Sequence, residues 1–337
     1  MNISHHISLK NYNTFGIDVT AKDFIAVTNT TELLKVVQLN NKNLFILGGG
    51  SNMLLTKDIE DALVVHVNIK GKTIIKENDD FAWITVNAGE NWHEFILWSL
   101  DKGYGGLENM SLIPGNIGTA PIQNIGAYGK ELKDNFVECN AIEIETGVSK
   151  TFSKVTCEFG YRNSVFKNKL KGKYIITSVT FKLTKRDHDL NTGYGAIENE
   201  LKKQNITSPT LKEISNAVIA IRQSKLPDPK KLGNSGSFFK NPVISQTEFE
   251  QFIAKFPEAP SYRVSDSEVK IPAGWLIEQA GFKGKQFGDA GVHKNQALVL
   301  VNYGNASGKE IWDLAMKIKT AVKNQFGIEI NPEVNVY

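Results

Sequence analysis

The chain has 337 residues and is poor in several residue types, and each shortage excludes a class of protein. Its two cysteines, Cys139 and Cys157, are too few for a disulfide framework or a multi-cysteine metal site. Both stand in apolar, strand-like surroundings, which predicts buried free thiols in a reducing compartment. The six histidines include no pair at metal-ligand spacing apart from the adjacent His5 and His6, so no metal site is predicted.

Charge and hydropathy exclude further classes. The net charge is only +3 and no run of lysine or arginine occurs, which argues against nucleic-acid binding. No apolar stretch is long enough to span a membrane, and the first residues lack the apolar core of a signal peptide. The length is sufficient for two or three domains. We therefore expect a cytoplasmic protein, monomeric, that binds neither nucleic acid nor membrane.

Glycine and small residues are concentrated in one long segment, Ser111–Gly129, with the sequence SLIPGNIGTAPIQNIGAYG. Glycine can adopt positive φ and lets the backbone approach a ligand closely. Successive turns of this kind can point several N–H groups at one anion. The segment shows no helical or strand period, and long loops of that kind are usually functional. The alternative is a structural loop that happens to be rich in glycine.

A second glycine cluster, Gly48-Gly49-Gly50-Ser51-Asn52, follows the short apolar strand expected at Leu44–Leu47. A strand that runs into a glycine turn is a common phosphate-binding arrangement. The cluster is not a Walker loop, because no Gly-Lys-Ser/Thr follows it. It is not a dinucleotide fingerprint either, because Met53–Leu55 predicts a further strand instead of a helix. Together, the two glycine-rich segments suggest turns that face one extended, phosphate-bearing ligand.

Hydrophobic periodicity predicts a chain of mixed helices and strands without internal repeats. The expected helices are a Thr31-capped helix through Val37, Trp92–Leu100, Ala196–Lys203, Thr210–Ser224, Thr247–Phe256, Ala273–Gln279 and a Ser307-capped helix through Phe326. The expected strands are Leu44–Leu47, Met53–Leu55, Ala62–Val67, Phe81–Ala88, Val137–Glu145, Tyr174–Leu183, Phe238–Phe239, Gln296–Val301 and Ile328–Tyr337. The sequence Leu226-Pro227-Asp228-Pro229 ends a helix and predicts a domain boundary.

Three polar residues stand in unusual surroundings. Arg162 follows Tyr161 shortly before an apolar pair, Ser237 lies between a glycine and two phenylalanines, and Glu333 is in the expected last strand. A buried charge is costly unless it is paired, so an arginine and a glutamate could converge on each other or on a substrate carboxylate. A serine held in a glycine turn could deliver a proton. Spacing alone does not bring the three together, and on that ground surface charges and a turn serine are the favoured interpretation.

Several motifs nevertheless resemble the UDP-N-acetylenolpyruvoylglucosamine reductases, flavoenzymes of bacterial peptidoglycan precursor synthesis. They occur in the family's order over nearly the whole chain: NTFGID, ILGGGSNML, LIPGNIGTAPIQNIGAYG, FGYRNSVFK, KLPDP, GNSGSFFKNP, VHKNQALVLVN and NPEV. The resemblance implies an α+β fold of the vanillyl-alcohol-oxidase type, in which two subdomains hold FAD and a third domain covers the substrate. It places the FAD-binding subdomains at residues 1–70 and 71–225, the substrate-binding domain at 226–327 and a last strand with Glu333 at 328–337.

The resemblance also implies the residues of an FAD site. The expected cofactor contacts come from the two glycine-rich segments and from one tyrosine: Gly48, Gly49, Gly50, Ser51, Asn52, Pro114, Gly115, Gly118, Gln123, Asn124, Gly126, Ala127, Tyr128, Gly129 and Tyr161. Relatives that attach FAD covalently use a histidine or cysteine near the ring. The segment Ser111–Gly129 contains neither, so a non-covalent flavin is expected.

The implied reaction is the NADPH-dependent reduction of UDP-N-acetylglucosamine enolpyruvate to UDP-N-acetylmuramate. NADPH reduces the flavin, and flavin N5 then gives a hydride to the methylene carbon of the enolpyruvyl group. The family's catalytic residues correspond to Arg162 and Glu333, near the substrate carboxylate, and to Ser237, which protonates the adjacent carbon. The expected substrate contacts are Tyr194, in the loop of the longer (type I) subgroup, Lys225 at the diphosphate, Asn241 and Gln296.

No separate dinucleotide fingerprint for NADPH occurs, which agrees with a ping-pong scheme in which NADPH and substrate take turns in one pocket. Two alternatives stay open. One is a flavin oxidase or dehydrogenase of the same fold that acts on another small molecule, although the presence of Arg162, Ser237 and Glu333 as a set argues against it. The other is a non-catalytic module that binds flavin or a nucleotide sugar.

Overall fold

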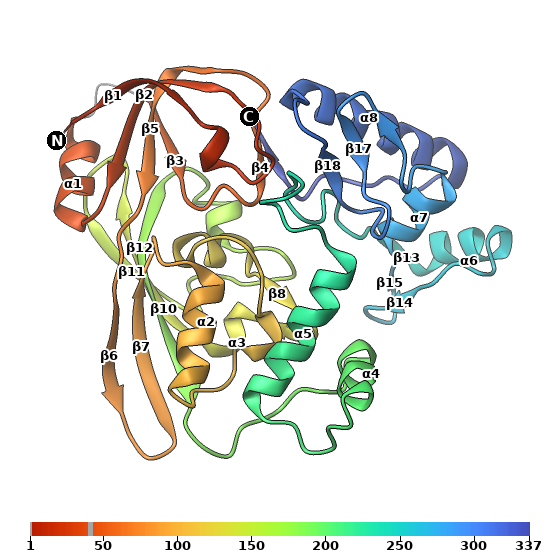
Figure 1. Cartoon of the computed structure of the whole chain (residues 1–337), viewed down its shortest axis with the longest axis horizontal. Helices are drawn as coiled ribbons and strands as arrows, with labels where there is room; N and C mark the ends of the chain where they lie inside the picture. Colours follow the sequence, from red (N-terminus) through yellow and green to blue (C-terminus); the bar gives the residue numbers. More distant parts are fainter. Residues whose placement is uncertain (1, 40–42) are drawn as a thin grey trace. The chain divides into compact units, whose positions relative to one another are not determined.

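The computed structural model describes residues 2–39 and 43–337. Its internal contacts divide the chain into two compact units, each of which is drawn in Figure 1. Unit 1 comprises Met1–Ile7, Ala21–Gly49 and Ile59–Gln223, and unit 2 comprises Ser8–Thr20, Gly50–Asp58 and Ser224–Tyr337. Two segments expected in the first FAD-binding subdomain, Ser8–Thr20 and Gly50–Asp58, therefore lie in unit 2. The glycine cluster is divided between the units after Gly49.

Unit 1 begins with a four-stranded sheet in the order β1-β2-β5-β3. Its strands are β1 (Ser4–Ser8), β2 (Thr20–Val27), β3 (Asn43–Leu47) and β5 (Ile59–Val67), and β5 is parallel to both β2 and β3. Helix α1 (Thr30–Gln38) packs on this sheet through Leu33, Val36 and Val37. Its N-cap is Asn29 and not Thr31 as expected, because the Asn29 side chain accepts the N–H of Glu32 at 2.9 Å.

The second sheet of unit 1 is antiparallel, in the order β11-β10-β12-β7-β6. Its strands are β6 (Lys72–Glu77), β7 (Phe81–Asn87), β10 (Phe136–Glu143), β11 (Ser149–Ser153) and β12 (Tyr174–Thr184). The expected central strands are confirmed, whereas the edge strands β6 and β11 were not predicted. Nearly all residues of these edge strands are exposed, so they lack the apolar alternation that marks a strand in sequence.

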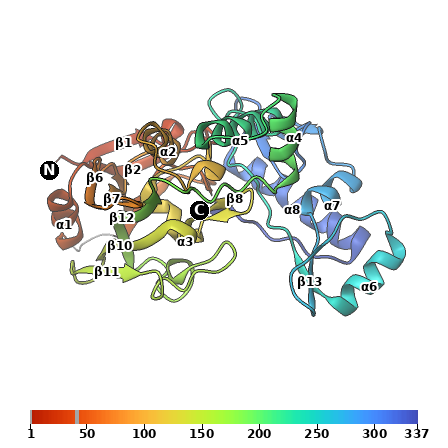
Figure 2. The ribbon, with the colours of Figure 1, turned by 90° about the horizontal axis from the view of Figure 1, so that it is seen from below.

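Further helices lie in unit 1, and Phe95, Leu132 and Leu211 from three of them pack into the core of this sheet. The helices are α2 (Trp92–Asp101), α3 (Leu132–Asn135), α4 (Gly195–Lys203) and α5 (Leu211–Lys225). Helices α4 and α5 lie side by side in both views (Figures 1 and 2) and share a small apolar core with Ile197, Leu201 and Val218. Cys139 and Cys157 are buried free thiols, as expected. Their mutual hydrogen bond, together with burial, raises the pKa of Cys139.

Unit 2 consists of small sheets and helices. The strands are β13 (Val243–Ser245), β14 (Tyr262–Arg263), β15 (Glu268–Lys270), β16 (Gln286–Phe287), β17 (Ala290–Val292) and β18 (Leu300–Asn302), and the helices are α6 (Gln246–Lys255), α7 (Ala273–Gln279) and α8 (Gly308–Phe326). Ser307 caps α8 with a capping box, as predicted. Among the residues that the structure describes, no helix has the length and apolar content needed to cross a membrane.

The chain ends in unit 2 beside the second glycine cluster. Strand β19 (Asn335–Val336) is parallel to β4 (Met53–Leu54), and the N–H of Thr56 donates to the carbonyl of Tyr337. The strand expected over Ile328–Tyr337 is confined to β19, so Glu333 precedes a strand instead of lying within one. Phe238 and Phe239 likewise lie outside a regular strand, because only single bridges pair Ser237 with Val299 and Phe239 with Pro332.

Candidate active site

Within unit 1, the two glycine-rich segments lie against each other. A Cβ atom built on Gly48 would lie 2.6 Å from Cγ2 of Thr119, and one built on Gly49 would lie 2.9 Å from Oδ1 of Asn116 and 3.0 Å from Cα of Gly115. No other residue type fits at these two positions without a shift of the neighbouring loop. The structure therefore places Gly48 and Gly49 in direct contact with the long glycine-rich segment; that both segments face one ligand stays a prediction.

The second half of the Ser111–Gly129 segment is more regular than its sequence suggests. Residues Ile117–Gln123 form a 3₁₀ helix, η3, although Pro121 lies inside it. Backbone hydrogen bonds of 2.9–3.0 Å join this region to the β7–α2 connection, from Ile117 to Glu90 and from Trp92 to Gly115. Because these backbone groups are hydrogen-bonded within the protein, we expect this half of the segment to be well ordered.

Asn124 joins the end of η3 to the turn that carries Arg162. The Asn124 side chain is fully buried, and its Nδ2 donates to Oε2 of Glu131 and to the carbonyl of Gly160, both at 3.1 Å. Its Oδ1 accepts the N–H of Lys133 at 3.0 Å. The Asn124 amide, expected to contact the cofactor, is thus bonded within the protein at both of its ends.

Arg162 is half-buried, and its backbone has a φ of 51°, in the left-handed region that non-glycine residues seldom adopt. Its Nη2 donates to the carbonyl of Gly126 at 2.8 Å, and its Cζ lies 5.7 Å from the centre of the Tyr161 ring. Asn124 and Tyr128 also have positive φ, at 43° and 49°. Strained backbone of this kind is concentrated at functional sites, where the surrounding structure enforces it.

Arg222 on α5 belongs to the same cluster, and the sequence interpretation missed it. Its Nε is buried without a hydrogen-bond partner among the described residues, while the guanidinium is hydrogen-bonded to the hydroxyl of Tyr128. Burial lowers the pKa of Arg222, Tyr128 opposes this, and the like charge of Arg162 lowers the pKa further. The helical spacing of four residues from Ile214 through Val218 to Arg222 places the arginine on the apolar face of α5. This spacing is the sequence signal from which a buried arginine on α5 could have been predicted.

Tyr194 ends the connection between β12 and α4, where it is the N-cap residue of α4. Its ring contacts the ring of Tyr128 edge to face, with centroids 5.4 Å apart and planes at 83°. The Tyr194 side chain is 51% exposed, so a ligand could reach it. The predicted substrate residue and the predicted cofactor residue are therefore neighbours in unit 1.

Unit 2 brings Ser237 and Glu333 together. The N–H of Glu333 donates to the carbonyl of Phe238 at 2.8 Å. Phe238 and Phe239 are almost fully buried, whereas Ser237 is exposed in the structure and Glu333 is half-buried. The two phenylalanines thus anchor this stretch and leave the Ser237 hydroxyl accessible to a ligand.

Asn52 also lies beside Glu333. Its Nδ2 donates to the carbonyl of Glu333 at 3.5 Å, and its own carbonyl accepts from Nδ2 of Asn335 at 3.0 Å. Gly50 accepts the N–H of Thr14 through its carbonyl, and a Cβ at Gly50 would collide with the carbonyl of Tyr12. The part of the glycine cluster in unit 2 is therefore held between the NTFG motif and the C-terminal segment.

Asn241 and Gln296 meet at the first turn of α7. The Oδ1 of Asn241 accepts the N–H of Ala273 at 2.9 Å, and a Cβ built on Gly274 would lie 3.2 Å from Oε1 of Gln296. Lys225 is the last residue of α5 and is exposed. The remaining predicted cofactor residues are Ser51 in unit 2 and Pro114, Gly118, Gln123, Ala127 and Gly129 in unit 1.

The residues present fit an FAD molecule. Gly48 and Gly49 form a turn that only glycine permits, which is the kind of surface that a pyrophosphate can approach. The Nε of Arg222, which is buried and has no hydrogen-bond partner among the described residues, supplies a cationic donor. The N–H of Leu112 donates to Nδ1 of His93 at 2.9 Å, which joins α2 to the start of the long glycine-rich segment.

Comparison with known proteins agrees with these features. Residues 21–152 match the sequence model of the family described as FAD binding domain, and residues 228–337 match that of UDP-N-acetylenolpyruvoylglucosamine reductase, C-terminal domain. The chain is 65% identical to the UDP-N-acetylenolpyruvoylglucosamine reductase of Flavobacterium johnsoniae over 337 residues, with all of both chains covered. It is 46% identical to the reductase of that name from Pseudomonas putida over 334 residues, with 98% of each chain covered.

The fold is similar to the crystal structure of UDP-N-acetylenolpyruvylglucosamine reductase from Thermus caldophilus, with a TM-score of 0.70 and 21% sequence identity over 100% of this chain and 99% of that one. This likeness and the matched FAD binding domain confirm the expected α+β FAD-binding fold. Full-length identity of 65% is far above the level at which membership of a family is in question. The chain belongs to the UDP-N-acetylenolpyruvoylglucosamine reductase family.

Proposed function

We propose that this protein reduces UDP-N-acetylglucosamine enolpyruvate to UDP-N-acetylmuramate, with NADPH as the reductant and a non-covalently bound FAD as the carrier. The observation that carries the proposal is the 65% identity, over the full length of both chains, to a relative named for this reductase. The presence of Arg162, Ser237 and Glu333 within the family's motifs supports it.

The two glycine-rich segments are proposed to hold the cofactor. FAD, when bound, supplies the hydride that is added to the methylene carbon of the enolpyruvyl group. Gly48 and Gly49 give the pyrophosphate a close approach to the backbone. The paired backbone of η3 keeps the binding surface preorganised, which reduces the ordering that a ligand must induce.

Arg162 and Glu333 are proposed to bind the substrate carboxylate. Hydride addition to the methylene carbon moves negative charge onto this carboxylate, and a guanidinium stabilises that charge with directed hydrogen bonds. The bond from Arg162 to the carbonyl of Gly126 orients the guanidinium before the substrate arrives. The Gly160–Asn163 turn, held by Asn124, keeps the Arg162 backbone in its strained conformation.

Ser237 is proposed to deliver the proton that completes the reduction. The double bond of the enolpyruvyl group is replaced by one new C–H bond from the hydride and one from the Ser237 hydroxyl, at the carbon that bears the carboxylate. A serine hydroxyl is a weak acid, but the charge-rich intermediate is basic enough to take its proton. The buried phenylalanines that follow Ser237 hold this hydroxyl in place.

Tyr194, Lys225, Asn241 and Gln296 are proposed to bind the rest of the substrate. Lys225 provides a point charge for the diphosphate, and the amides of Asn241 and Gln296, gathered at α7, can bind the sugar or uridine. NADPH is proposed to use the same pocket in turn, as the family resemblance implies, and the sequence holds no dinucleotide fingerprint for it.

Anaerobic absorbance spectroscopy of the purified protein tests the proposal. We expect a yellow protein that bleaches on addition of NADPH and recovers its colour only with UDP-N-acetylglucosamine enolpyruvate. Bleaching without recovery would agree with a flavoprotein that NADPH reduces but would overturn the proposed substrate. A colourless protein that does not take up added FAD would overturn both the proposed cofactor and the proposed substrate. Flavin that stays with the denatured chain would contradict non-covalent binding.

A further inference from the structure

A single buried amide lies at the junction of two segments that the proposed function uses. One segment is Tyr128–Lys130, at the end of the long glycine-rich segment, and the other is Asp189–Tyr194, the stem that leads to the proposed substrate residue Tyr194. Asn109, in the 3₁₀ helix Glu108–Met110, lies between them and is fully buried. Asn109 belongs to neither segment and was not predicted as a site residue.

The Asn109 amide bonds to both segments at once. Its Nδ2 donates to the carbonyl of Tyr128 at 3.1 Å and to the carbonyl of Asn191 at 2.8 Å. An amide nitrogen has two hydrogens, so these two bonds use its whole donor capacity. The Oδ1 of Asn109 is buried and has no hydrogen-bond partner among the described residues. A buried acceptor without a partner is costly, so what Asn109 contributes comes from its two donated bonds.

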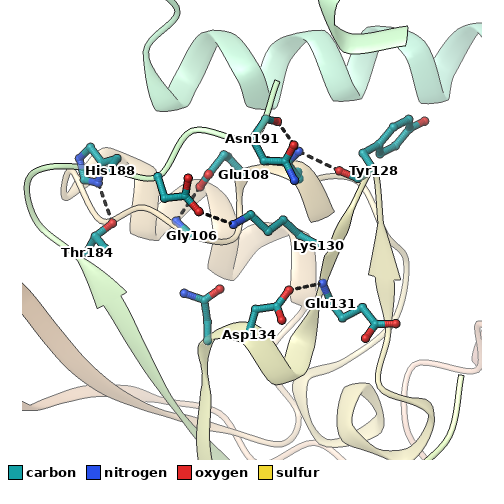
Figure 3. A network of polar contacts seen from close by, with 12 residues as sticks. Gly106, Glu108, Tyr128, Lys130, Glu131, Asp134, Thr184, His188 and Asn191 are labelled. Atoms are coloured by element: carbon teal, nitrogen blue, oxygen red, sulfur yellow. Dashed lines mark hydrogen bonds and ion pairs between the residues drawn. The ribbon is translucent and has the colours of Figure 1, made fainter. Parts of the chain in front are cut away.

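Two further contacts hold the same segments together. Nζ of Lys130 lies 3.1 Å from Oδ2 of Asp189, and the rings of Tyr128 and Tyr194 pack edge to face. Gly129 has a φ of 81°, and a Cβ there would lie 3.0 Å from Nδ2 of Asn191. All these residues are in unit 1, and Figure 3 shows Tyr128, Lys130 and Asn191 gathered in one polar network.

We propose that Asn109 is a positioning residue for the substrate site: its amide, with one N–H on each carbonyl, sets the place of Tyr194 against Tyr128, so that substrate affinity depends on Asn109 through Tyr194. The inference rests on the proposed role of Tyr194 as a substrate contact. The packing of the Tyr194 ring on the Tyr128 ring does not by itself fix the position of Asp189–Tyr194, because ring contacts have little directionality. Two hydrogen bonds from one rigid amide restrict both carbonyls to a narrow range of positions.

A double-mutant cycle on the holoenzyme tests the inference. The variants are Asn109→Asp, which keeps the shape but replaces the two donors with an oxygen, Tyr194→Ala, and both together. The measured quantity is the Kd of UDP-N-acetylglucosamine enolpyruvate, followed through the absorbance of the bound oxidised flavin. We expect Asn109→Asp to raise this Kd about ten-fold in the otherwise unchanged protein. In the Tyr194→Ala background, the same change should raise it less than about two-fold.

The matched control is Asn135→Asp. The Asn135 amide also donates to a backbone carbonyl of unit 1, that of Lys182 at 3.1 Å, and Lys182 belongs to neither segment. It should leave the substrate Kd within about two-fold of the unchanged protein. If Asn109→Asp does not retain FAD, Asn109→Ser replaces it, because serine keeps one donor and removes the unpaired Oδ1. The serine variant should raise the Kd about three-fold, again only when Tyr194 is present.

The outcomes separate the inference from the proposed function. If Asn109→Asp raises the substrate Kd by the same factor with and without the Tyr194 ring, the positioning role of Asn109 is overturned, and Tyr194 remains a substrate contact. A Tyr194→Ala enzyme with unchanged substrate Kd would overturn the substrate role of Tyr194 and the inference with it. Retained bleaching by NADPH and recovery with the substrate in that variant would show that the proposed reaction itself stands.

Discussion

The backbone N–H of Glu333 donates to the carbonyl of Phe238 at 2.8 Å, so that Glu333 lies across from the residue that follows Ser237. The bridge between Phe239 and Pro332 extends the same pairing. Two residues that stand far apart in the sequence are thereby held next to each other by main-chain bonds, which side-chain substitutions do not remove. Either side chain can therefore be replaced with little change in the other's position.

Replacing Ser237 with alanine should separate the two half-reactions. Flavin reduction by NADPH should keep its rate within about two-fold, while reoxidation by the enolpyruvyl substrate should slow by at least about a hundred-fold, the usual contribution of a positioned proton donor. Stopped-flow absorbance under anaerobic conditions measures both rates. Ser237→Cys, which retains a dissociable proton, is the comparison variant and should recover part of the second rate. An equal loss in both half-reactions would contradict the role of Ser237 as the proton donor.

Replacing Gly49 with alanine should weaken FAD binding. The added Cβ would lie within 3.0 Å of Asn116 and Gly115, and the resulting shift should cost about 1–3 kcal/mol, which is roughly five-fold to 160-fold in the Kd of FAD. Quenching of FAD fluorescence on titration with apoprotein measures the change. Gly195→Ala is the matched control, because a Cβ there meets nothing within 4 Å. Unchanged FAD affinity in Gly49→Ala would show that the contact between the two glycine-rich segments does not shape the cofactor site.

Replacing Arg222 with methionine should leave the stability of the fold unchanged or higher while it weakens substrate binding. The guanidinium is buried, its Nε is unpaired, and Arg162 repels it, so an apolar side chain of similar length should not reduce the free energy of unfolding. We expect the Tm of the ligand-free protein to stay the same or to rise by about 2–4 °C. Affinity for the anionic substrate should fall by about ten-fold or more, because one cation of the cluster is lost.

Differential scanning calorimetry and the flavin-absorbance titration measure these two effects of Arg222→Met. Arg222→Lys keeps a charge without the planar fork and should restore only part of the affinity. A lower Tm together with unchanged substrate affinity would mean that Arg222 is a structural residue of α5.

Replacing His93 with asparagine should flatten the pH dependence of stability. Burial lowers the pKa of His93 and the Arg222 guanidinium lowers it further, whereas Glu94 acts in the opposite direction. Because the folded pKa lies below the unfolded value of about 6.5, the unfolded chain binds the proton first as the pH falls. The contribution of His93 to stability is therefore fully present above about pH 6.5 and is lost as the pH falls toward the folded pKa.

Urea unfolding of the purified protein at several values between about pH 7 and pH 5 measures this effect. The decrease in the free energy of unfolding should be smaller in His93→Asn, since asparagine can still accept the N–H of Leu112. The decrease should not vanish, because the pKa values of His66 and His293 are also lowered by burial. His6→Asn at an exposed position is the control, and an unchanged slope in His93→Asn would contradict the assignment.

Much of the fold was accessible from the sequence where a local signal was strong. The capping box at Ser307 and the apolar stripe of α8 predicted that helix nearly to the residue, because both signals arise within a few turns of chain. The edge strands β6 and β11 were missed, because exposed strands carry no apolar alternation. The last strand was predicted too long, because Ile328, Ile330 and Val334 alternate and are buried although only Asn335–Val336 forms a strand. Asn29 replaced Thr31 as the cap of α1, a choice between adjacent capping residues that composition alone does not decide.

The sequence by itself determined the family, the FAD-binding fold and the position of each motif, because these follow from residue identity and order. Tertiary structure alone decided which polar groups meet. It gave the Asn124 side chain hydrogen bonds within the protein, left the Nε of Arg222 without a partner in the part of the chain that the structure describes, and placed the Asn109 amide between Tyr128 and Asn191. A hydrogen bond depends on distances and angles that only the folded chain establishes, so no spacing in the sequence could have revealed these relationships.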